Sequence, residues 1–507
     1  MRRLLSLLLL LPAAARADEP LKDELKRFDR QLRIAHANVG PSLACIVASR
    51  SDKYPKPAAP VESWQLGRFD RDAFLKADPK QAALALSLDL SNPESIPDHG
   101  FAGGAVIDAA GYVLTNYHAI EGATKIYVHL GGGGGSYADI RAADSRCDLA
   151  VLKLLDPPAG LKPIRFGTVR LPAFKDDPKA TVAGGSMCLL MALDFTAGTA
   201  FDKPKAGFAT IRGVHRAKSK GDASSLFSSI YNYAPILEYE SKLHSGASGA
   251  VLLNIDGEAV GFTTAAAALP PGEGGDGFAL PLDGNLTRII DVLRRGEEVE
   301  YGFLGVTRTL QQFGVQGRGI PIENHVGPGT PAAAARLRPG DVILNINDIP
   351  VSTFEDLLLH VGHGLAGRKI SLSIINGNQT REATITLAKF KNEVPFIASV
   401  RPEPVFGLRV DHGSVLLQMQ FNPFFGGGGR AFTDVPSGVL VREPLPGTPA
   451  AAKFKELGDA RWVVSHVNGT AVTTPAEFYK EAAGKKSVTL TVMNANDPGL
   501  PREVTLP

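Results

Sequence analysis

A serine of this chain lies in a local sequence that could support acyl transfer. Ser248 is part of a turn of small residues, Gly246-Ala247-Ser248-Gly249, which leads directly into an apolar segment. Glycines permit a tight, exposed turn, and backbone N–H groups near such a serine could stabilise an oxyanion. On its own, a hairpin turn that happens to contain a serine is the simpler interpretation.

A histidine and an aspartate supply the other groups that this chemistry needs. His118 stands at the end of a predicted strand in the segment 115–120 (TNYHAI), and Asp148 opens the apolar segment 148–154 (DLAVLKL). Taken singly, His118 could be structural, and Asp148 could accept a hydrogen bond from its own backbone. The order His, Asp, Ser along the chain is, however, one of the convergent orders of the catalytic triad, found in serine proteases built of two barrels.

The composition is that of a loop-rich globular protein. The chain has 507 residues, enough for three or four domains, with 44% hydrophobic and 21% charged residues. It contains 54 glycines and 36 prolines, which favours β structure over helix. The net charge is +2 and there is no long basic run, so nucleic acid is not expected as a partner.

The first seventeen residues have the pattern of a secretory signal peptide. Arg2 and Arg3 precede an apolar core, Leu4–Leu11, and Ala15-Arg16-Ala17 matches an A-x-A cleavage site. The alternative, a membrane anchor, is disfavoured because a spanning helix needs about 20 apolar residues. We therefore expect an exported chain without a stable membrane span.

The cysteines indicate neither a disulfide framework nor a metal site. There are three, Cys45, Cys147 and Cys188, all in apolar surroundings and at spacings that match no metal motif. We expect three buried thiols, and no metal or cofactor.

Short apolar segments at regular spacing predict β-barrels or sandwiches. An amphipathic helix is expected over 18–40, a long insertion loop over 50–99, a glycine-rich hairpin tip over 131–135 and a second helix over 286–295. The predicted strands cover 41–49, 105–108, 112–116, 126–130, 150–154, 183–191, 209–214, 236–239, 251–254 and 259–264.

The last third of the chain contains an internal repeat. The seven residues Pro328–Ala334 (PGTPAAA) recur unchanged as Pro446–Ala452, 118 positions later. Both copies are followed by a Gly-Asp turn, an apolar strand and a predicted helix. Two copies of one module of about 100 residues are therefore expected.

At five places, and in the same order, the chain resembles the HtrA/Deg family of exported serine endoproteases. The resemblance covers about residues 40–507 and implies a mainly β fold: a chymotrypsin-like double six-stranded β-barrel followed by two PDZ domains of α+β type with two helices each. The matching segments are 115–120 (TNYHAI), 148–154 (DLAVLKL), 244–254 (HSGASGAVLLN), 277–281 (GFALP) and 302–306 (GFLGV). The implied organisation is a signal peptide (1–17), an N-terminal helical segment (18–40), a trypsin-like protease domain (41–298), a first PDZ domain (299–398) and a second (399–507).

The resemblance also assigns roles to residues. It implies that Ser248 is the nucleophile, that His118 moves its proton and that Asp148 orients the imidazole. The backbone N–H groups of Gly246 and Ser248 would form the oxyanion hole. The sequence departs from the family motif at Ala247 and Ala250, and at Lys242 just upstream, which either points into solvent or alters the specificity pocket.

The implied partners are unfolded proteins or peptides at the active site and peptide C-termini at the PDZ domains. In the first PDZ domain the N–H groups of Leu304, Gly305 and Val306 would bind the peptide carboxylate. The second PDZ domain could instead be an assembly or regulatory surface. Its insertion Phe421–Phe432 (FNPFFGGGGRAF) is either a client-binding loop or a buried hairpin.

The resulting hypothesis is an exported serine endopeptidase of the periplasm or cell envelope that degrades misfolded proteins as a trimer or an assembly of trimers. The alternative is a weakly active or inactive chaperone or PDZ scaffold that keeps the protease fold.

Overall fold

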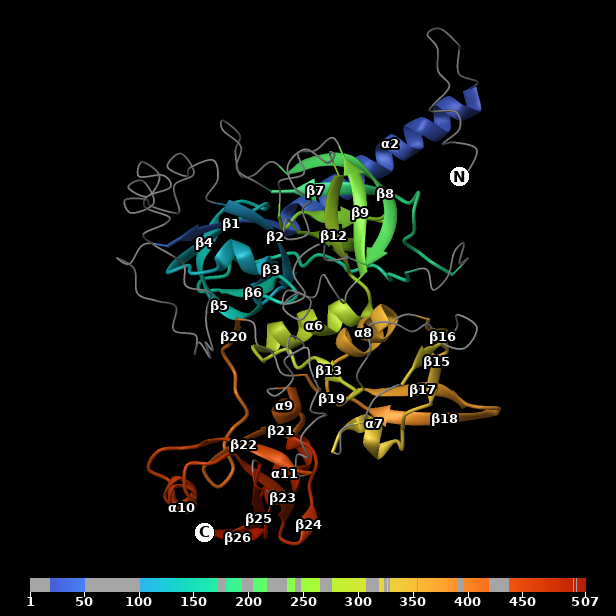
Figure 1. Ribbon diagram of the computed structural model, residues 1–507. Helices are drawn as coiled ribbons and strands as arrows, with labels where there is room; N and C mark the ends of the chain where they lie inside the picture. The colour runs from blue at the N-terminus through green and yellow to red at the C-terminus, as the bar shows by residue number, and fades with distance from the viewer. Residues whose placement is uncertain are drawn as a thin grey trace, which may run out of the picture.

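The computed structural model describes two β-barrels and two smaller modules that follow them (Figure 1). The predicted signal peptide, residues 51–100, the positions Lys242, Gly246 and Ala247, and the insertion Phe421–Phe432 lie outside the described residues. The described residues are 19–50, 101–171, 179–193, 204–216, 235–241, 248–264, 276–306, 319–322, 326, 329–352, 354–390, 395–418, 437–495, 497 and 499–507.

The first barrel is closed by a long, bent strand. Its described strands are antiparallel in the order β5-β4-β1-β2-β3-β6, and β5 also pairs with β6. A register shift between Ile140 and Ala142 lets β5 reach both neighbours. The strands are β1 (Leu43–Ser49), β2 (Phe101–Asp108), β3 (Tyr112–Thr115), β4 (Lys125–Leu130), β5 (Gly135–Asp144) and β6 (Leu149–Leu154).

The second barrel closes in the order β10-β11-β12-β9-β8-β7 among the described strands. The mainly β, double-barrel fold expected from the sequence is therefore confirmed. The strand predicted from residue 183 begins only at Met187, because Ser186 donates its N–H to Ala183 in a turn. The strands are β7 (Met187–Ala192), β8 (Lys205–Arg216), β9 (Pro235–Ser241), β10 (Val251–Leu253), β11 (Ala259–Thr263) and β12 (Asp276–Pro281).

Two helices pack on the barrels. Helix α2 (Glu19–Val39) leads through a short 3-10 turn, η1 (Gly40–Ser42), into β1. It buries Ala35 and Val39, whereas Ile34 is 52% exposed. Helix α6 (Gly284–Arg295) starts at Asp283, whose carboxylate caps two N–H groups, and ends at Gly296 with φ of 88°.

The three cysteines are buried free thiols, as expected. Cys45 and Cys147 belong to the apolar core that runs between the barrels and α6, and Cys188 belongs to the core of the second barrel. Among the described residues no helix has both the length and the apolar character needed to cross a membrane.

The first copy of the repeat lies in the first small module. Its main sheet has the antiparallel order β14-β15-β17-β18, and β16 pairs with β15. Its elements are β13 (Gly302–Phe303), β14 (Ile320–Pro321), α7 (Pro331–Ala334), β15 (Val342–Ile346), β16 (Ile349–Pro350), α8 (Phe354–Gly362), β17 (Lys369–Asn376), β18 (Gln379–Thr386) and β19 (Ala388–Lys389).

The second small module has the order β21-β22-β23-β25-β26 and places its copy of the repeat in the same context. Thr330 and Thr448 each accept the N–H of the third residue of the following helix, at 3.2 and 3.3 Å. Its elements are β21 (Leu408–His412), α9 (Ser414–Gln418), β22 (Val439–Pro444), α10 (Pro449–Leu457), β23 (Trp462–Val467), β24 (Thr470–Ala471), α11 (Pro475–Ala482), β25 (Val488–Asn494) and β26 (Arg502–Leu506).

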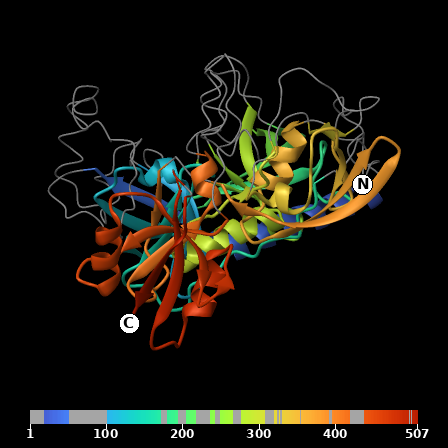
Figure 2. The same cartoon turned by 60° about the horizontal axis from the view of Figure 1, so that its bottom comes forward.

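The segment between the two modules returns to the first barrel. Strand β20 (Phe396–Ala398) pairs antiparallel with the end of β5, with Phe396 opposite Asp144 (Figure 1). This pairing fixes the connection to the second module. In Figure 2 the second module, in red, lies on the same side of the view as the first barrel. The sequence gives no sign of this strand addition, which depends on which sheet edge the folded barrel leaves open.

A group of charged residues, here called the linker ion cluster, joins the two modules to the chain that leaves α6. Lys389, with only 3% of its side chain exposed, lies 2.9 Å from Glu298, 3.3 Å from Glu300 and 3.1 Å from Asp411. Arg442 lies 3.2 Å from Glu298 and 3.4 Å from Asp411. Burial alone would lower the pKa of Lys389, but the surrounding carboxylates raise it, so this lysine is held charged.

His412 makes the linker ion cluster sensitive to acid. Burial lowers the pKa of His412 to about 4 from 6.5, despite the carboxylates of Asp411 and Glu298 nearby. Between these pH values the unfolded chain takes up a proton at His412 and the folded chain does not, so acid favours unfolding. The expected loss of stability between pH 7 and pH 4 is about 3 kcal/mol from this residue.

We therefore predict that His412→Gln reduces the difference in unfolding free energy between pH 7 and pH 4 by about that amount. The measurement is urea unfolding at both pH values, followed by the fluorescence of the buried Trp462 in a Trp64→Phe background. An equal acid-induced loss in the variant and its His412 parent would contradict the assignment.

Candidate active site

The structure brings His118, Asp148 and Ser248 together, although they come from separate elements. His118 lies in α5 (Tyr117–Ile120), a single helical turn after β3, and not at a strand end as expected. The strand stops at Thr115, and the N–H of Tyr117 then donates to the backbone oxygen of Asp148 at 3.1 Å. This bond ties the histidine turn to the start of β6.

The three side chains form one continuous chain of hydrogen bonds. His118 Nε2 lies 3.0 Å from Ser248 Oγ, and His118 Nδ1 lies 2.9 Å from both Asp148 carboxylate oxygens. An ionised carboxylate only accepts, so the Nδ1 proton faces Asp148 and Nε2 is left to accept the serine proton. Asp148 is 3% exposed and Ser248 is 8% exposed. The histidine side chain is 38% exposed, which leaves it open to a substrate.

Asp148 is held by more donors than His118 alone. Its Oδ1 accepts the backbone N–H of His118 at 3.0 Å. Its Oδ2 accepts Thr264 Oγ1 at 2.7 Å and Asn116 Nδ2 at 3.2 Å. Its backbone has φ of 51°, a left-handed value that the bonds from Tyr117 and Asn116 to its carbonyl oxygen hold in place.

Ser248 and Gly249 lie where the two barrels meet. Gly103 of β2 donates its N–H to the backbone oxygen of Ser248 at 2.7 Å. Ala250 donates its N–H to Thr263 Oγ1 at 2.8 Å. Gly249 has φ of 82°, and a Cβ there would lie 2.0 Å from Gly103 O. Only glycine fits at this position. Ala250, which departs from the family motif, is buried without disturbing these bonds.

Sequence reasoning missed Thr264 and Asn116. Both are buried, at 4% and 0% exposure, and both contact the aspartate from outside its own strand. The available signal was a hydroxyl and an amide directly beside apolar strands, where buried polar groups need partners. Which partner they find depends on the packing of one barrel against the other.

Thr264 offers a graded test of the aspartate's surroundings. Thr264→Val keeps the shape and removes a hydrogen bond to a charged group, typically about 1.5–3 kcal/mol. We expect kcat for peptide hydrolysis to fall about 10- to 100-fold with little change in KM, and Thr264→Ser to stay within about threefold of the parent. Equal rates for the valine and serine variants would show that this bond does not support Asp148.

Two residues of the carboxylate loop expected in the first module contact the start of α7. Leu304 is buried and its oxygen accepts the N–H of Ala332 at 2.9 Å. Gly305 has φ of 90°, and a Cβ there would lie 2.3 Å from Thr330, the residue that caps α7. The loop is therefore anchored to the first repeat copy, with its glycine required by the close approach.

The corresponding edge of the second module already has partners for its N–H groups. On β21, Leu408 donates to Val405 O at 3.0 Å and Val410 donates to the hydroxyl of Tyr479 on α11 at 3.3 Å. The N–H of His412 donates to Asp411 Oδ1 at 2.7 Å. A peptide added to this edge would have to displace these contacts. That favours the interpretation of this module as an assembly or regulatory surface.

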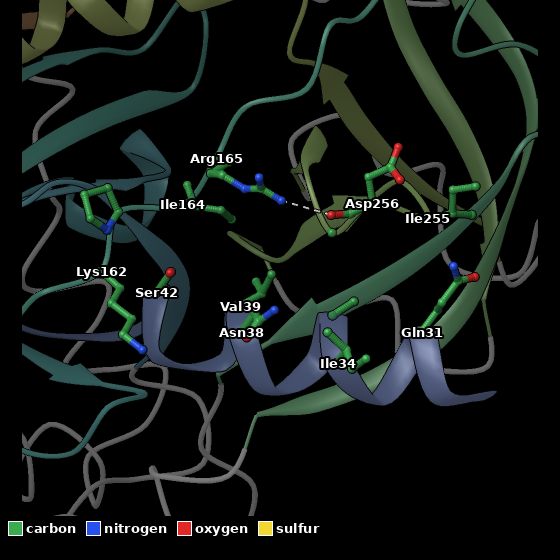
Figure 3. Close-up of a pocket in the computed structure, with 13 residues that line it drawn as sticks. Gln31, Ile34, Asn38, Val39, Ser42, Lys162, Ile164, Arg165, Ile255 and Asp256 are labelled. Carbon is green, nitrogen blue, oxygen red and sulfur yellow. Dashed lines mark hydrogen bonds between the residues drawn. The ribbon is translucent and has the colours of Figure 1, made fainter. Parts of the chain in front are cut away.

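A separate pocket lies between α2 and the barrels, with a volume of about 450 Å³ (Figure 3). Figure 3 shows Gln31 and Asn38 of the helix below Ile255 and Arg165, with Lys162 at the end of the pocket beside Ser42. Arg165 donates to the backbone oxygen of Asp256 at 3.1 Å. None of the three triad residues lines it.

Comparison with protein families gives two matches. Residues 102–262 match the trypsin-like peptidase domain and residues 302–387 match the PDZ domain. Among curated proteins, the periplasmic pH-dependent serine endoprotease DegQ of Escherichia coli is 26% identical over 420 residues, 81% of each chain. The periplasmic serine endoprotease DegP of the same organism is 26% identical over 391 residues, 76% of this chain and 72% of its own.

Solved structures of similar proteins include the HtrA-type protease AlgW with a tripeptide. It shows 22% identity and a TM-score of 0.45, over 71% of this chain and 99% of that chain. The serine endoprotease from Yersinia pestis shows 22% identity and a TM-score of 0.41, over 72% of this chain and 98% of its own.

Proposed function

The chain belongs to the HtrA/Deg family of serine endoproteases, and we propose that it hydrolyses peptide bonds in misfolded or damaged proteins through an acyl-enzyme. The observation that carries this proposal is the continuous hydrogen-bond chain from Ser248 through His118 to Asp148. That chain is what a serine needs to become a nucleophile at neutral pH.

The proposed reaction has two halves. In the first, Ser248 Oγ attacks the scissile carbonyl carbon while His118 Nε2 takes its proton, and the resulting tetrahedral oxyanion expels the amine, which receives that proton. In the second, His118 takes a proton from water, the hydroxide attacks the acyl carbon, and the proton returns to Ser248 as the new carboxylic acid leaves. Asp148 stabilises the imidazolium in both halves.

The oxyanion is proposed to be held by the backbone N–H groups of Gly246 and Ser248. One such donor is typically worth about 3 kcal/mol of transition-state stabilisation. These donors belong to the backbone, so the departures at Ala247 and Ala250 do not remove them.

The small modules are proposed to bind peptides and regulate cleavage. The match of residues 302–387 to the PDZ domain supports this for the first module, with Leu304, Gly305 and Val306 as its carboxylate loop. The engaged edge of β21 supports an assembly or regulatory role for the second. A trimer, or an assembly of trimers, is proposed from the family alone.

The proposed location is the periplasm or cell envelope, reached through cleavage after residue 17. The leader pattern of the sequence and the periplasmic names of the relatives support it. The rival function is an inactive chaperone or scaffold. It is disfavoured because neither role requires His118, Asp148 and Ser248 to be hydrogen-bonded in a catalytic arrangement.

The test is the release of peptides from casein, an unfolded substrate, by the mature chain and by its Ser248→Ala variant. The expected result is cleavage by the parent alone. Equal release by both would overturn the proposal.

A further inference from the structure

The five-residue loop that carries the proposed catalytic aspartate contacts the segments that connect the PDZ modules to the rest of the chain. This loop, here called the aspartate loop, spans Asp144–Asp148, from the last residue of β5 to the residue before β6. Asp144 is fully buried, and its Oδ1 accepts the N–H groups of Arg146 at 2.7 Å and Cys147 at 3.3 Å. Asp148 closes the turn by donating its N–H to Ser145 O at 3.3 Å.

Arg146 is the residue of this loop that reaches toward the first module. It is 2% exposed, and its guanidinium carbon lies 4.3 Å from the ring centre of Tyr301 and 4.9 Å from that of Phe390. A flat guanidinium on aromatic faces is a favourable geometry, and it is strongest where water is excluded. Tyr301 is itself completely buried.

The two rings stand at the base of the first PDZ module. Tyr301 directly precedes β13 and Phe390 directly follows β19, and these two short strands pair with each other. Phe390 also donates its N–H to Tyr301 O at 2.7 Å. The chain thus enters and leaves the module at the two groups that hold Arg146.

Two further contacts hold the same loop from the segment that follows. Ser145 donates its N–H to Pro395 O at 3.1 Å, and Phe396 of β20 pairs with Asp144. Lys389, next to Phe390, is the centre of the linker ion cluster that reaches the second module. Contacts from both ends of the first PDZ module and from the segment that follows it therefore meet at the aspartate loop.

We propose that Arg146, clamped between Tyr301 and Phe390, is a positioning residue that sets the place of Asp148 relative to His118. The aromatic residues at the base of the first PDZ module thereby help to keep Asp148 within hydrogen-bond distance of His118. Displacement of a reacting group by about 1 Å can cost about 100-fold in rate, so a loosened clamp is expected to slow the chemical step. The proposal rests on the proposed protease function.

The test is a set of variants in the full mature chain that separate the aromatic face from other properties of the site. Tyr301→Leu removes the ring and Tyr301→Phe keeps it; Arg146→Lys keeps the charge and loses the flat guanidinium. Each is measured for kcat and KM on casein, for the rate at which a fluorophosphonate acylates Ser248, and for its thermal unfolding midpoint.

The expected result is a roughly tenfold fall in kcat and in acylation rate for Tyr301→Leu and Arg146→Lys, with KM within about twofold, and parental values for Tyr301→Phe. If Tyr301→Leu does not fold, Arg146→Lys decides. Unchanged acylation in a folded Arg146→Lys or Tyr301→Leu variant would overturn this inference while leaving the protease function standing. Failure of the parent to be acylated would instead overturn the proposed function.

Discussion

Replacement of Ser248 by alanine is expected to lower casein hydrolysis roughly 10⁶-fold, to the background rate. In the proposed reaction, the hydroxyl oxygen of Ser248 becomes the ester oxygen of the acyl-enzyme. The side chain is almost buried and its neighbours are fixed through backbone bonds to Gly103 and Thr263. Alanine therefore removes the nucleophile without disturbing the fold.

The comparison needs a serine whose loss leaves the chemistry intact. Ser241→Ala, on β9, removes a hydroxyl that donates to the backbone oxygen of Phe208 at 2.9 Å. Its hydrolysis rate should stay within about twofold of the parent, since surface substitutions change stability by about 0.5 kcal/mol or less. Residual cleavage in Ser248→Ala above 1% of the parent rate would point to another nucleophile or to a contaminating protease.

Asp148→Asn is expected to lower kcat about 10⁴-fold while casein binding changes little. The amide would present an N–H₂ group where His118 Nδ1 now meets a carboxylate oxygen 2.9 Å away. The imidazole would then carry its proton on Nε2, facing Ser248, and could not accept the serine proton. Thr264 and the N–H of His118, which both donate to this carboxylate, would compete for the one remaining acceptor.

The measurement is kcat and KM on casein for Asp148→Asn beside Asp156→Asn, an exposed aspartate just beyond β6. The control should retain the parental kcat. A fall of less than tenfold in Asp148→Asn would mean that the aspartate does not orient the histidine in the working enzyme.

Much of the candidate site could be predicted because its signals are local. A histidine after one apolar strand, an aspartate before another and a serine in a glycine turn each leave a short pattern, and their order along the chain narrows the chemistry. The double barrel follows from short strands at regular spacing in the same way. The fold class could be predicted because the apolar residues of most strands form short segments that the sequence alone identifies.

The parts that sequence reasoning missed depend on contacts between distant segments. Thr264 and Asn116 look like ordinary polar residues beside strands until the barrels meet and both contact Asp148. In the sequence, Lys389 resembles a surface lysine. In the structure it is surrounded by three carboxylates, two from residues that precede the first module in sequence and one from a residue that follows it. The helical turn that carries His118 is too short for any periodic pattern to reveal.

The structure explains one of the departures from the family motif and does not describe the others. Ala250 can be understood, because its N–H and oxygen both bond to Thr263 and its side chain is small enough to be buried. Its presence leaves the backbone bonds of Ser248 and Gly249 intact. Lys242 and Ala247 lie outside the described residues, so the two interpretations of Lys242, a side chain in solvent or one that alters the specificity pocket, stay predictions.

The most direct test of the account is covalent labelling of the nucleophile. The mature chain is treated with a fluorophosphonate, digested and mapped by mass spectrometry, beside Ser248→Ala and Asp148→Asn. We expect one adduct per chain, on Ser248, absent from Ser248→Ala and formed at a greatly reduced rate in Asp148→Asn. An unlabelled parent chain, or an adduct on a different residue, would contradict it.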